Sequence, residues 1–238
     1  MTLSLQSPSV KPEGLLHING AELVADGAGA LFWPARRTLM VADLHLEKGS
    51  AFAERGVLLP PYDTAATLQR LAAAIERHRP ERVVCLGDSF HDAGAAARLA
   101  PDHAALIERL TAAREWIWIA GNHDPAPPAA WGGKVAAELT LGPLVLRHQA
   151  ADGIHAPGEV SGHYHPKASV RLRAGGYTGR CFVTDGRRVI LPAFGAYAGG
   201  LDVLDPAVAG LFPRGFRVRL LGRSGVYDFP KTALAPVG

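Results

Sequence analysis

The chain has 238 residues, of which 48% are hydrophobic and 20% are charged, and it contains 27 glycines and 18 prolines. This composition can bury a full core as one domain over residues 1–238, and it excludes intrinsic disorder and a collagen-like structure. The net charge is nearly balanced at +3. Because no run of about 18 apolar residues occurs, we expect no membrane-spanning helix and no membrane partner.

The N-terminal stretch, MTLSLQSPSVKPEG, lacks a basic segment followed by an apolar one. A secretory signal has that order, so we expect no signal peptide and a cytoplasmic location. Short β-rich runs follow at residues 15–18, 21–25, 30–33 and 38–46. The last run ends in polar residues, as expected of a strand that delivers a site at its carboxyl end.

Helical periodicity begins near residue 63, where Asp63 or Thr64 can cap the first turn. The residues at the i, i+3, i+4 and i+7 positions of one buried face are Leu68, Leu71, Ala72 and Ile75. Pro80 ends this helix. A second helix is expected from about residue 103 to 114, with Leu106, Ile107 and Leu110 facing inward.

Strands are expected at residues 82–88 and 115–124, so strands and helices alternate through the first half of the chain. That order predicts an α/β fold with at least part of its sheet parallel. Beyond residue 134 the helical pattern stops, and short alternating runs follow at 143–148, 158–165, 168–173, 180–184 and 187–194. They predict a second, largely antiparallel sheet. Two sheets packed together with helices on the outside are the simplest way to close the core.

Several predicted strands end in side chains that can ligate metals. These side chains are Asp43, His45, Asp88, Asn122, His123 and His148, and a G-H-Y-H motif adds His163 and His165. Each motif alone is weak, but open sheets collect ligands at strand ends, so the set predicts one site. Residues i and i+2 of a strand point the same way. Asp43 and His45 can therefore converge on one ion, as can His163 and His165.

The ligand types favour particular metals. Mixed carboxylate and imidazole ligands suit Mn, Fe, Zn or Co better than calcium. The seven expected ligands, which are these side chains without His123, are too many for one tetrahedral site but fit two ions that share a carboxylate. Two ions about 3.5–4 Å apart clamp both the attacking and the leaving oxygens of a phosphoryl transfer. The sequence therefore predicts a two-metal phosphoesterase.

The ordered motifs D-L-H (43–45), G-D (87–88), G-N-H-D (121–124), His148 and G-H-Y-H (162–165) resemble those of the calcineurin-like metallophosphoesterases. The resemblance implies a four-layer α/β sandwich, two mixed β-sheets flanked by helices. It implies that one metal is held by Asp43, His45, Asp88 and His165. The second metal is then held by Asn122, His148 and His163, together with Asp88, which both metals share. It also implies a metal-bridging hydroxide as the nucleophile. His123 would then donate a proton to the leaving oxygen or stabilise the phosphoryl charge.

The sequence departs from this family in one place. Many members have an acid three residues after the bridging Asp, where this chain has His91, followed by Asp92. Whether Asp92, Asp124 or neither orients His123 stays open. His91 itself either supports the site or is a polar surface residue.

Two cations follow the first metal motif. Lys48 and Arg55 could contact a substrate phosphate, where positive charge would complement the developing negative charge. The other interpretation is that they form the solvated start of a helix.

Further stretches, A-D-L-H-L-E-K-G, L-P-P-Y-D-T, G-D-S-F-H-D and P-A-F-G-A-Y-A-G-G, resemble the ligase-associated DNA damage response endonucleases of bacteria. This resemblance implies a manganese-dependent phosphodiesterase that acts on DNA, found with a DNA ligase, a helicase and an exonuclease-like protein. From Pro166 onward, eleven Lys and Arg residues face four Asp residues, a net charge of +7. That basic third suits a polyanionic partner or forms a solvated face.

Two other functions remain as alternatives. A small-molecule phosphoesterase acting on a nucleotide, cyclic nucleotide or pyrophosphate would use the same residues. A non-catalytic scaffold would have eroded ligands, whereas all positions here carry competent side chains. The sequence does not fix the oligomeric state.

Overall fold

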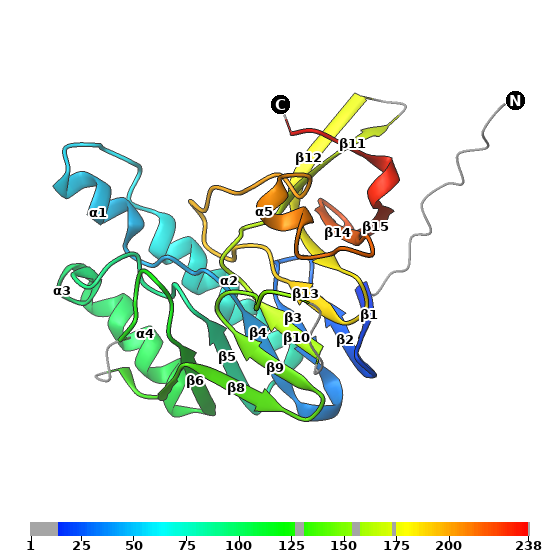
Figure 1. The fold of residues 1–238 in the computed structure, drawn as a ribbon. Coiled ribbons are helices and arrows are strands. Elements are labelled where there is room, and N and C mark those ends of the chain that lie inside the picture. Colours follow the sequence, from blue (N-terminus) through cyan, green and yellow to red (C-terminus); the bar gives the residue numbers. More distant parts are fainter. Residues whose placement is uncertain (1–13, 127–130, 154–157, 173–174, 238) are drawn as a thin grey trace, which may run out of the picture.

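The computed structural model describes residues 14–126, 131–153, 158–172 and 175–237. The stretch considered for a signal peptide therefore lies almost entirely outside the described residues. Two β-sheets pack face to face, and the longer helices lie against the first of them (Figure 1). Among the described helices, none has both the length and the apolar character needed to cross a bilayer.

The first sheet has seven strands within the described residues, in the order β1 to β7. They are β1 (Gly14–Ile18), β2 (Ala21–Ala25), β3 (Leu31–Trp33), β4 (Thr38–Val41), β5 (Arg82–Leu86), β6 (Glu115–Ile119) and β7 (Lys134–Ala136). Strands β1 to β4 pair in antiparallel fashion, and β4 to β7 pair in parallel. The predicted parallel region is thus confirmed.

The helices are α1 (Lys48–Glu54), α2 (Asp63–His78), α3 (Ala95–Arg98), α4 (Pro101–Ala112) and α5 (Pro206–Ala209), with short 3-10 turns at Pro34–Arg36 and Lys231–Ala233. The α2 face is confirmed at Leu68, Leu71 and Ile75, with Ala74 rather than Ala72 completing it. Helix α4 begins two residues earlier than expected because Pro101 suits a first helical turn.

The second sheet has nine strands within the described residues. They are β8 (Glu138–Leu141), β9 (Leu144–Arg147), β10 (Gly158–Ser161), β11 (Lys167–Leu172), β12 (Gly175–Thr184), β13 (Arg188–Ile190), β14 (Arg217–Gly222), β15 (Gly225–Pro230) and β16 (Leu234–Ala235). Among the described strands of this sheet, only β10 pairs in parallel, with β9 and with β13. The other described pairs are antiparallel, which confirms the prediction.

Strand β4 shows how the layers form. Leu39 and Val41 pack with α2 and α4, whereas Met40 packs between the two sheets. A strand covered on both faces needs a continuous apolar run rather than alternation. The outer face of the second sheet is covered by α5 and by Phe212 and Phe216. The chain is therefore an α/β sandwich of two mixed sheets, with a thin layer over the second.

The predicted cap of α2 is wrong. Its N-cap is Tyr62, which makes no side-chain capping bond. The Asp63 carboxylate instead accepts a hydrogen bond from the Gly49 N–H (2.9 Å), and the Thr64 hydroxyl accepts one from the Glu47 N–H (2.9 Å). Both side chains are buried, so they fasten the start of α1 to α2 instead of capping the helix they begin.

Asp26 ties the turn between β2 and β3 to α2. Its buried carboxylate accepts hydrogen bonds from Arg77 (2.5 Å), His78 (2.7 Å) and the Ala28 N–H (2.7 Å). Burial is the strongest influence and raises the pKa of Asp26, but these donors outweigh it and lower the pKa to about 2.

We expect Asp26→Asn to cost about 2 kcal/mol of unfolding free energy at pH 7, because it removes a charge-assisted network. A depressed carboxyl pKa stabilises the fold above the unfolded value near 4, and that stabilisation is lost as pH falls towards about 2. The difference between wild type and variant should therefore shrink over that range. Thermal unfolding across pH 2–7 measures it, and a constant difference would contradict this role for Asp26. Exposed Asp102, changed to Asn, is the control.

Candidate metal centre

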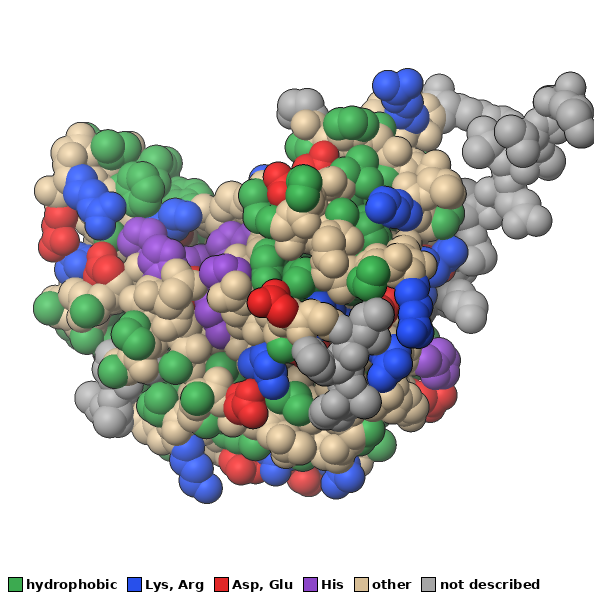
Figure 2. Space-filling view, viewed as in Figure 1, with side chains coloured by type: hydrophobic (Ala, Val, Ile, Leu, Met, Phe, Trp, Pro, Cys, Tyr) green, Lys and Arg blue, Asp and Glu red, His purple; other side chains and the backbone are tan. Residues whose placement is uncertain are grey.

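The chain segments that follow β4 and β5 run side by side. The Asp43 N–H donates to the Gly87 carbonyl (3.2 Å), and the His45 N–H donates to the Asp88 carbonyl (2.9 Å). Because β4, β5 and β6 are parallel neighbours, the polar residues after them meet at one edge of the sheet. Figure 2 shows the histidines gathered there in a hollow of the surface.

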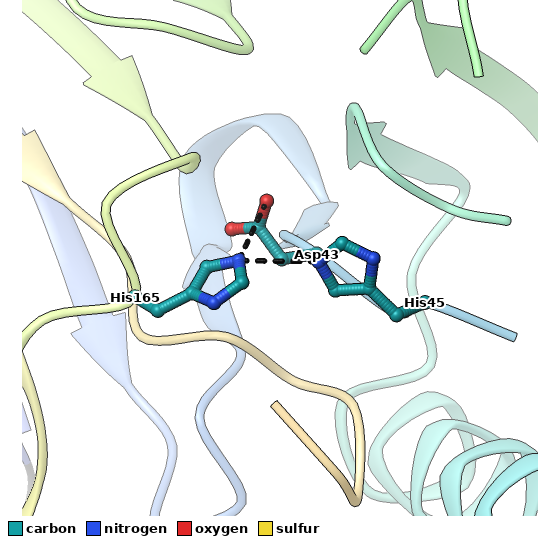
Figure 3. A group of neighbouring side chains, drawn as sticks. All are labelled: Asp43, His45 and His165. Atoms are coloured by element: carbon teal, nitrogen blue, oxygen red, sulfur yellow. Dashed lines mark hydrogen bonds and ion pairs between the residues drawn. The ribbon is translucent and has the colours of Figure 1, made fainter. Parts of the chain in front are cut away.

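A first cluster of possible ligands consists of Asp43, His45 and His165, whose side chains point toward one another (Figure 3). His165 Nε2 lies 3.4 Å from Asp43 Oδ1 and 3.2 Å from His45 Nε2. Asp43 and His45 are buried, and His165 is partly exposed. The three side chains could hold one metal ion.

A second cluster consists of Asp88, His148 and His163. His163 Nδ1 lies 3.1 Å from His148 Nε2. Asn122 joins this cluster, with its Oδ1 at 2.8 Å from His148 Nε2 and 3.0 Å from His163 Nδ1. These four side chains could hold a second ion.

Asp88 belongs to the second cluster and also faces the first. Its Oδ2 is 3.5 Å from His148 Nε2 in the second cluster and 3.9 Å from His45 Nε2 in the first. Its Oδ1 accepts a hydrogen bond from the His123 N–H (2.9 Å). The carboxylate is thus placed where one group can serve both ion positions.

The chemistry of these donors fits divalent cations. Two imidazole nitrogens face each other at 3.2 Å in the first cluster and at 3.1 Å in the second. Bonds of about 2.0–2.2 Å to a shared ion would place ligand atoms roughly 3 Å apart. Burial, reinforced by His165, lowers the pKa of His45 to about 2, so its ring is neutral and can ligate. The Leu86 carbonyl accepts from His148 Nδ1 (2.9 Å), which leaves Nε2 for the cluster.

The convergence of these residues does not come from strand alternation. Strand β10 ends at Ser161, before His163 and His165, and these two histidines lie in different clusters. The expectation that they converge on one ion is therefore wrong. Asp43 and His45 share a cluster, but they also lie beyond the end of their strand, β4.

Turns with a left-handed backbone conformation, instead of strand alternation, bring these ligands together. Positive φ angles occur at Asp43 (55°), His45 (44°), Asp88 (46°), His163 (73°) and His165 (48°). This left-handed conformation is uncommon for residues other than glycine and clusters at functional sites. Five of the seven predicted ligands are therefore positioned by turns that follow the strands.

His123 is exposed and belongs to neither cluster. Its Nδ1 faces the main-chain carbonyl of His91 at 3.0 Å, and its ring stacks on the His91 ring at 5.5 Å between centroids. The ring of His45 lies edge-on to it at 5.2 Å. His91 is buried and so supports the site instead of forming a polar surface.

Neither candidate acid hydrogen-bonds the His123 side chain among the described residues. Asp92 accepts from Arg98 (2.6 Å) and from the Gly94 N–H (2.9 Å). Asp124 accepts from the Ser89 and Phe90 N–H groups (2.9 and 3.1 Å), so it joins the segments after β5 and β6. Burial, reinforced by the charge of Asp88, raises the pKa of Asp124 to about 7.

The glycine-rich stretch at 192–200 packs against the segments that carry Asp43, Leu44 and His165. The Gly195 N–H donates to the Asp43 carbonyl (3.1 Å). A Cβ atom on Gly195 would lie 2.3 Å from the Leu44 carbonyl oxygen, and one on Gly200 would lie 2.4 Å from that of His165. Close backbone approach therefore requires glycine at both places.

We expect Gly195→Ala to lower phosphoesterase activity about tenfold or more and to cost about 1–3 kcal/mol of unfolding free energy, because the added methyl must displace the Asp43–His45 segment. Gly199→Ala is the matched control, since a Cβ there meets nothing within 4 Å. Turnover and thermal unfolding of both variants are the measurements. Equal behaviour of the two variants would contradict the supporting role of Gly195.

Two clusters of carboxylate and imidazole donors, with one carboxylate between them, define a metal-dependent hydrolase of phosphoester bonds. The family model of the calcineurin-like phosphoesterases matches residues 36–184. That match covers more than half of the chain, so the chain belongs to the calcineurin-like phosphoesterase family.

Two solved structures are similar to this chain, one more closely than the other. The Pseudomonas putida nuclease MPE is 31% identical with a TM-score of 0.70, over 91% of this chain and 100% of that chain. Yfce, a phosphoesterase from E. coli, is 11% identical with a TM-score of 0.40, over 81% of this chain and 98% of that chain. No curated protein matches the chain.

Proposed function

We propose that this chain is a two-metal phosphodiesterase that cleaves DNA and serves in DNA repair. The position of Asp88 between two ligand clusters carries the proposal, because paired ions with a shared carboxylate suit phosphoryl displacement. The likeness to a nuclease over 91% of this chain supports a nucleic-acid substrate.

Asp43, His45, Asp88 and His165 would hold one ion, and Asp88, Asn122, His148 and His163 would hold the other. Their mixed donors suit manganese, which we propose as the metal, and also iron, zinc or cobalt. When bound, the two ions supply Lewis acidity towards phosphoryl oxygens and a nucleophile drawn from water.

His123 would act on the leaving group. Its Nδ1 is occupied by the His91 carbonyl, so Nε2 is the ring nitrogen free to face a substrate. The main-chain N–H of His123 donates to Asp88, which anchors the backbone of His123 to the carboxylate that both ions would share. A histidine so placed can give a proton to the departing oxygen or stabilise charge on the phosphoryl group.

Metal-stripped protein incubated with Mn, Fe, Zn or Mg tests the proposal, with circular DNA and bis(p-nitrophenyl) phosphate as substrates. Metal-dependent nicking of the circle would establish an endonuclease. Hydrolysis of the small diester without DNA cleavage would overturn the DNA substrate and move the activity to a nucleotide or another small phosphoester. Cleavage that weakens steeply with salt would support contacts to a phosphate backbone.

A further inference from the structure

The segment between the first metal motif and α2, residues 48–62, forms a lobe at the edge of the metal centre, named here the α1 lobe (Figure 1). Phe52 of this lobe lies 5.8 Å from the His91 ring, between centroids. The His91 ring in turn stacks on His123. The lobe therefore continues directly from the site, and Figure 2 shows hydrophobic side chains on that flank of the hollow, with basic and acidic ones among them.

The tip of the lobe exposes apolar side chains. Leu58 is 86% exposed, Tyr62 70% and Val57 49%, which is half of the large hydrophobic residues exposed in the described part of the chain. Scattered single residues need no explanation, but three such side chains within residues 57–62 make this segment a candidate binding surface.

The tip is also held in place. The Tyr197 hydroxyl donates to the Pro60 carbonyl (2.6 Å), which ties the tip to the glycine-rich stretch behind the metal centre. Pro60 and Pro61 restrict the backbone beside Leu58. A rigid segment that presents apolar side chains loses little conformational entropy on binding.

The acids in and beside the lobe are engaged with other partners. Glu54 of the lobe and neighbouring Asp92 both pair with Arg98, and Glu47, which precedes the lobe, accepts from the Ser50 hydroxyl (2.6 Å). Within the described residues, Lys48 and Arg55 form no salt bridge. Lys48 Nζ lies 6.0 Å from the centre of the Phe52 ring, which in turn contacts the His91 ring. Arg55 follows α1 three residues beyond Phe52, so both cations lie on the segment that contacts the site.

We propose that the α1 lobe is a second contact surface for the DNA substrate, an inference that rests on the proposed function. Lys48 and Arg55 would contact backbone phosphates, and Leu58 and Tyr62 would contact bases beside the scissile phosphate. Apolar and aromatic side chains flanked by cations are the combination that holds an unpaired or locally unstacked strand.

The test is the double variant Leu58→Ser/Tyr62→Ser in the full-length, manganese-loaded protein. We expect its KM for DNA to rise about tenfold or more, while hydrolysis of bis(p-nitrophenyl) phosphate stays within about twofold. The matched control is Val135→Ser/Leu172→Ser, which removes two exposed hydrophobic residues from strands β7 and β11. Binding of a fluorescein-labelled DNA oligonucleotide to metal-free protein, followed by anisotropy, should show the same rank order without turnover.

Unchanged DNA affinity and KM in the double variant, with a wild type that cleaves DNA, would overturn the lobe proposal alone. A wild type that hydrolyses only the small diester would overturn both the lobe proposal and the DNA substrate. A wild-type dimer that dissociates in the double variant, with DNA binding unchanged, would reassign the lobe to a contact between two copies of the chain.

Discussion

Replacing Asp88 with asparagine is expected to reduce phosphodiesterase activity by at least about a thousandfold while the protein stays folded. Asparagine keeps the shape of the side chain and an oxygen that can accept from the His123 N–H. It removes one negative charge between the two clusters. A unit charge at about 4 Å from another is worth roughly 4 kcal/mol at an effective dielectric of 20, which corresponds to about a thousandfold in affinity.

Metal content separates this effect from unfolding. We expect the wild type to bind two ions per chain and Asp88→Asn to bind fewer, as measured by mass spectrometry after equilibration with manganese. Circular dichroism should be unchanged, and Asp102→Asn on the exposed face of α4 should retain full activity. Two bound ions together with activity within tenfold of wild type would contradict the role of Asp88 as a ligand that both ions share.

The sequence could predict which residues gather because that information is local. Continuous apolar runs mark β4, β5 and β6, and the helical periods between them require parallel crossovers. Parallel neighbours place their carboxyl ends together, so Asp43, Asp88 and Asn122 had to meet. His148 follows β9, which pairs in parallel with β10, but the sequence predicted only a largely antiparallel second sheet and so did not predict this pairing.

The conformations within the site could not be predicted, because they depend on contacts between distant segments. Asp63 and Thr64 look like helix caps, yet they accept hydrogen bonds from the start of α1. No local pattern in the sequence indicates this contact. The partner of the His123 side chain is a main-chain carbonyl, so no side chain in the sequence could reveal it. The left-handed turns at Asp43 and His165 likewise leave no pattern of hydrophobic residues from which they could be predicted.

The loss of the His123 side chain is expected to slow DNA cleavage by about 10²–10⁴-fold, the range for removal of a general acid. Both ions should stay bound in His123→Ala, because His123 belongs to neither cluster and its N–H bond to Asp88 survives the substitution. Metal content equal to wild type therefore distinguishes this variant from Asp88→Asn. His17→Ala, which changes an exposed histidine on β1, is the control.

A comparison of two leaving groups decides which role His123 plays. The alkoxide released from DNA is a much stronger base than p-nitrophenolate, so it needs a proton from the enzyme whereas p-nitrophenolate does not. If His123 is the proton donor, His123→Ala should lose far more activity on DNA than on bis(p-nitrophenyl) phosphate. Similar losses on both substrates would instead assign it to stabilising the phosphoryl charge. A loss below tenfold on DNA would contradict both roles, since each requires the imidazole beside the reacting phosphate.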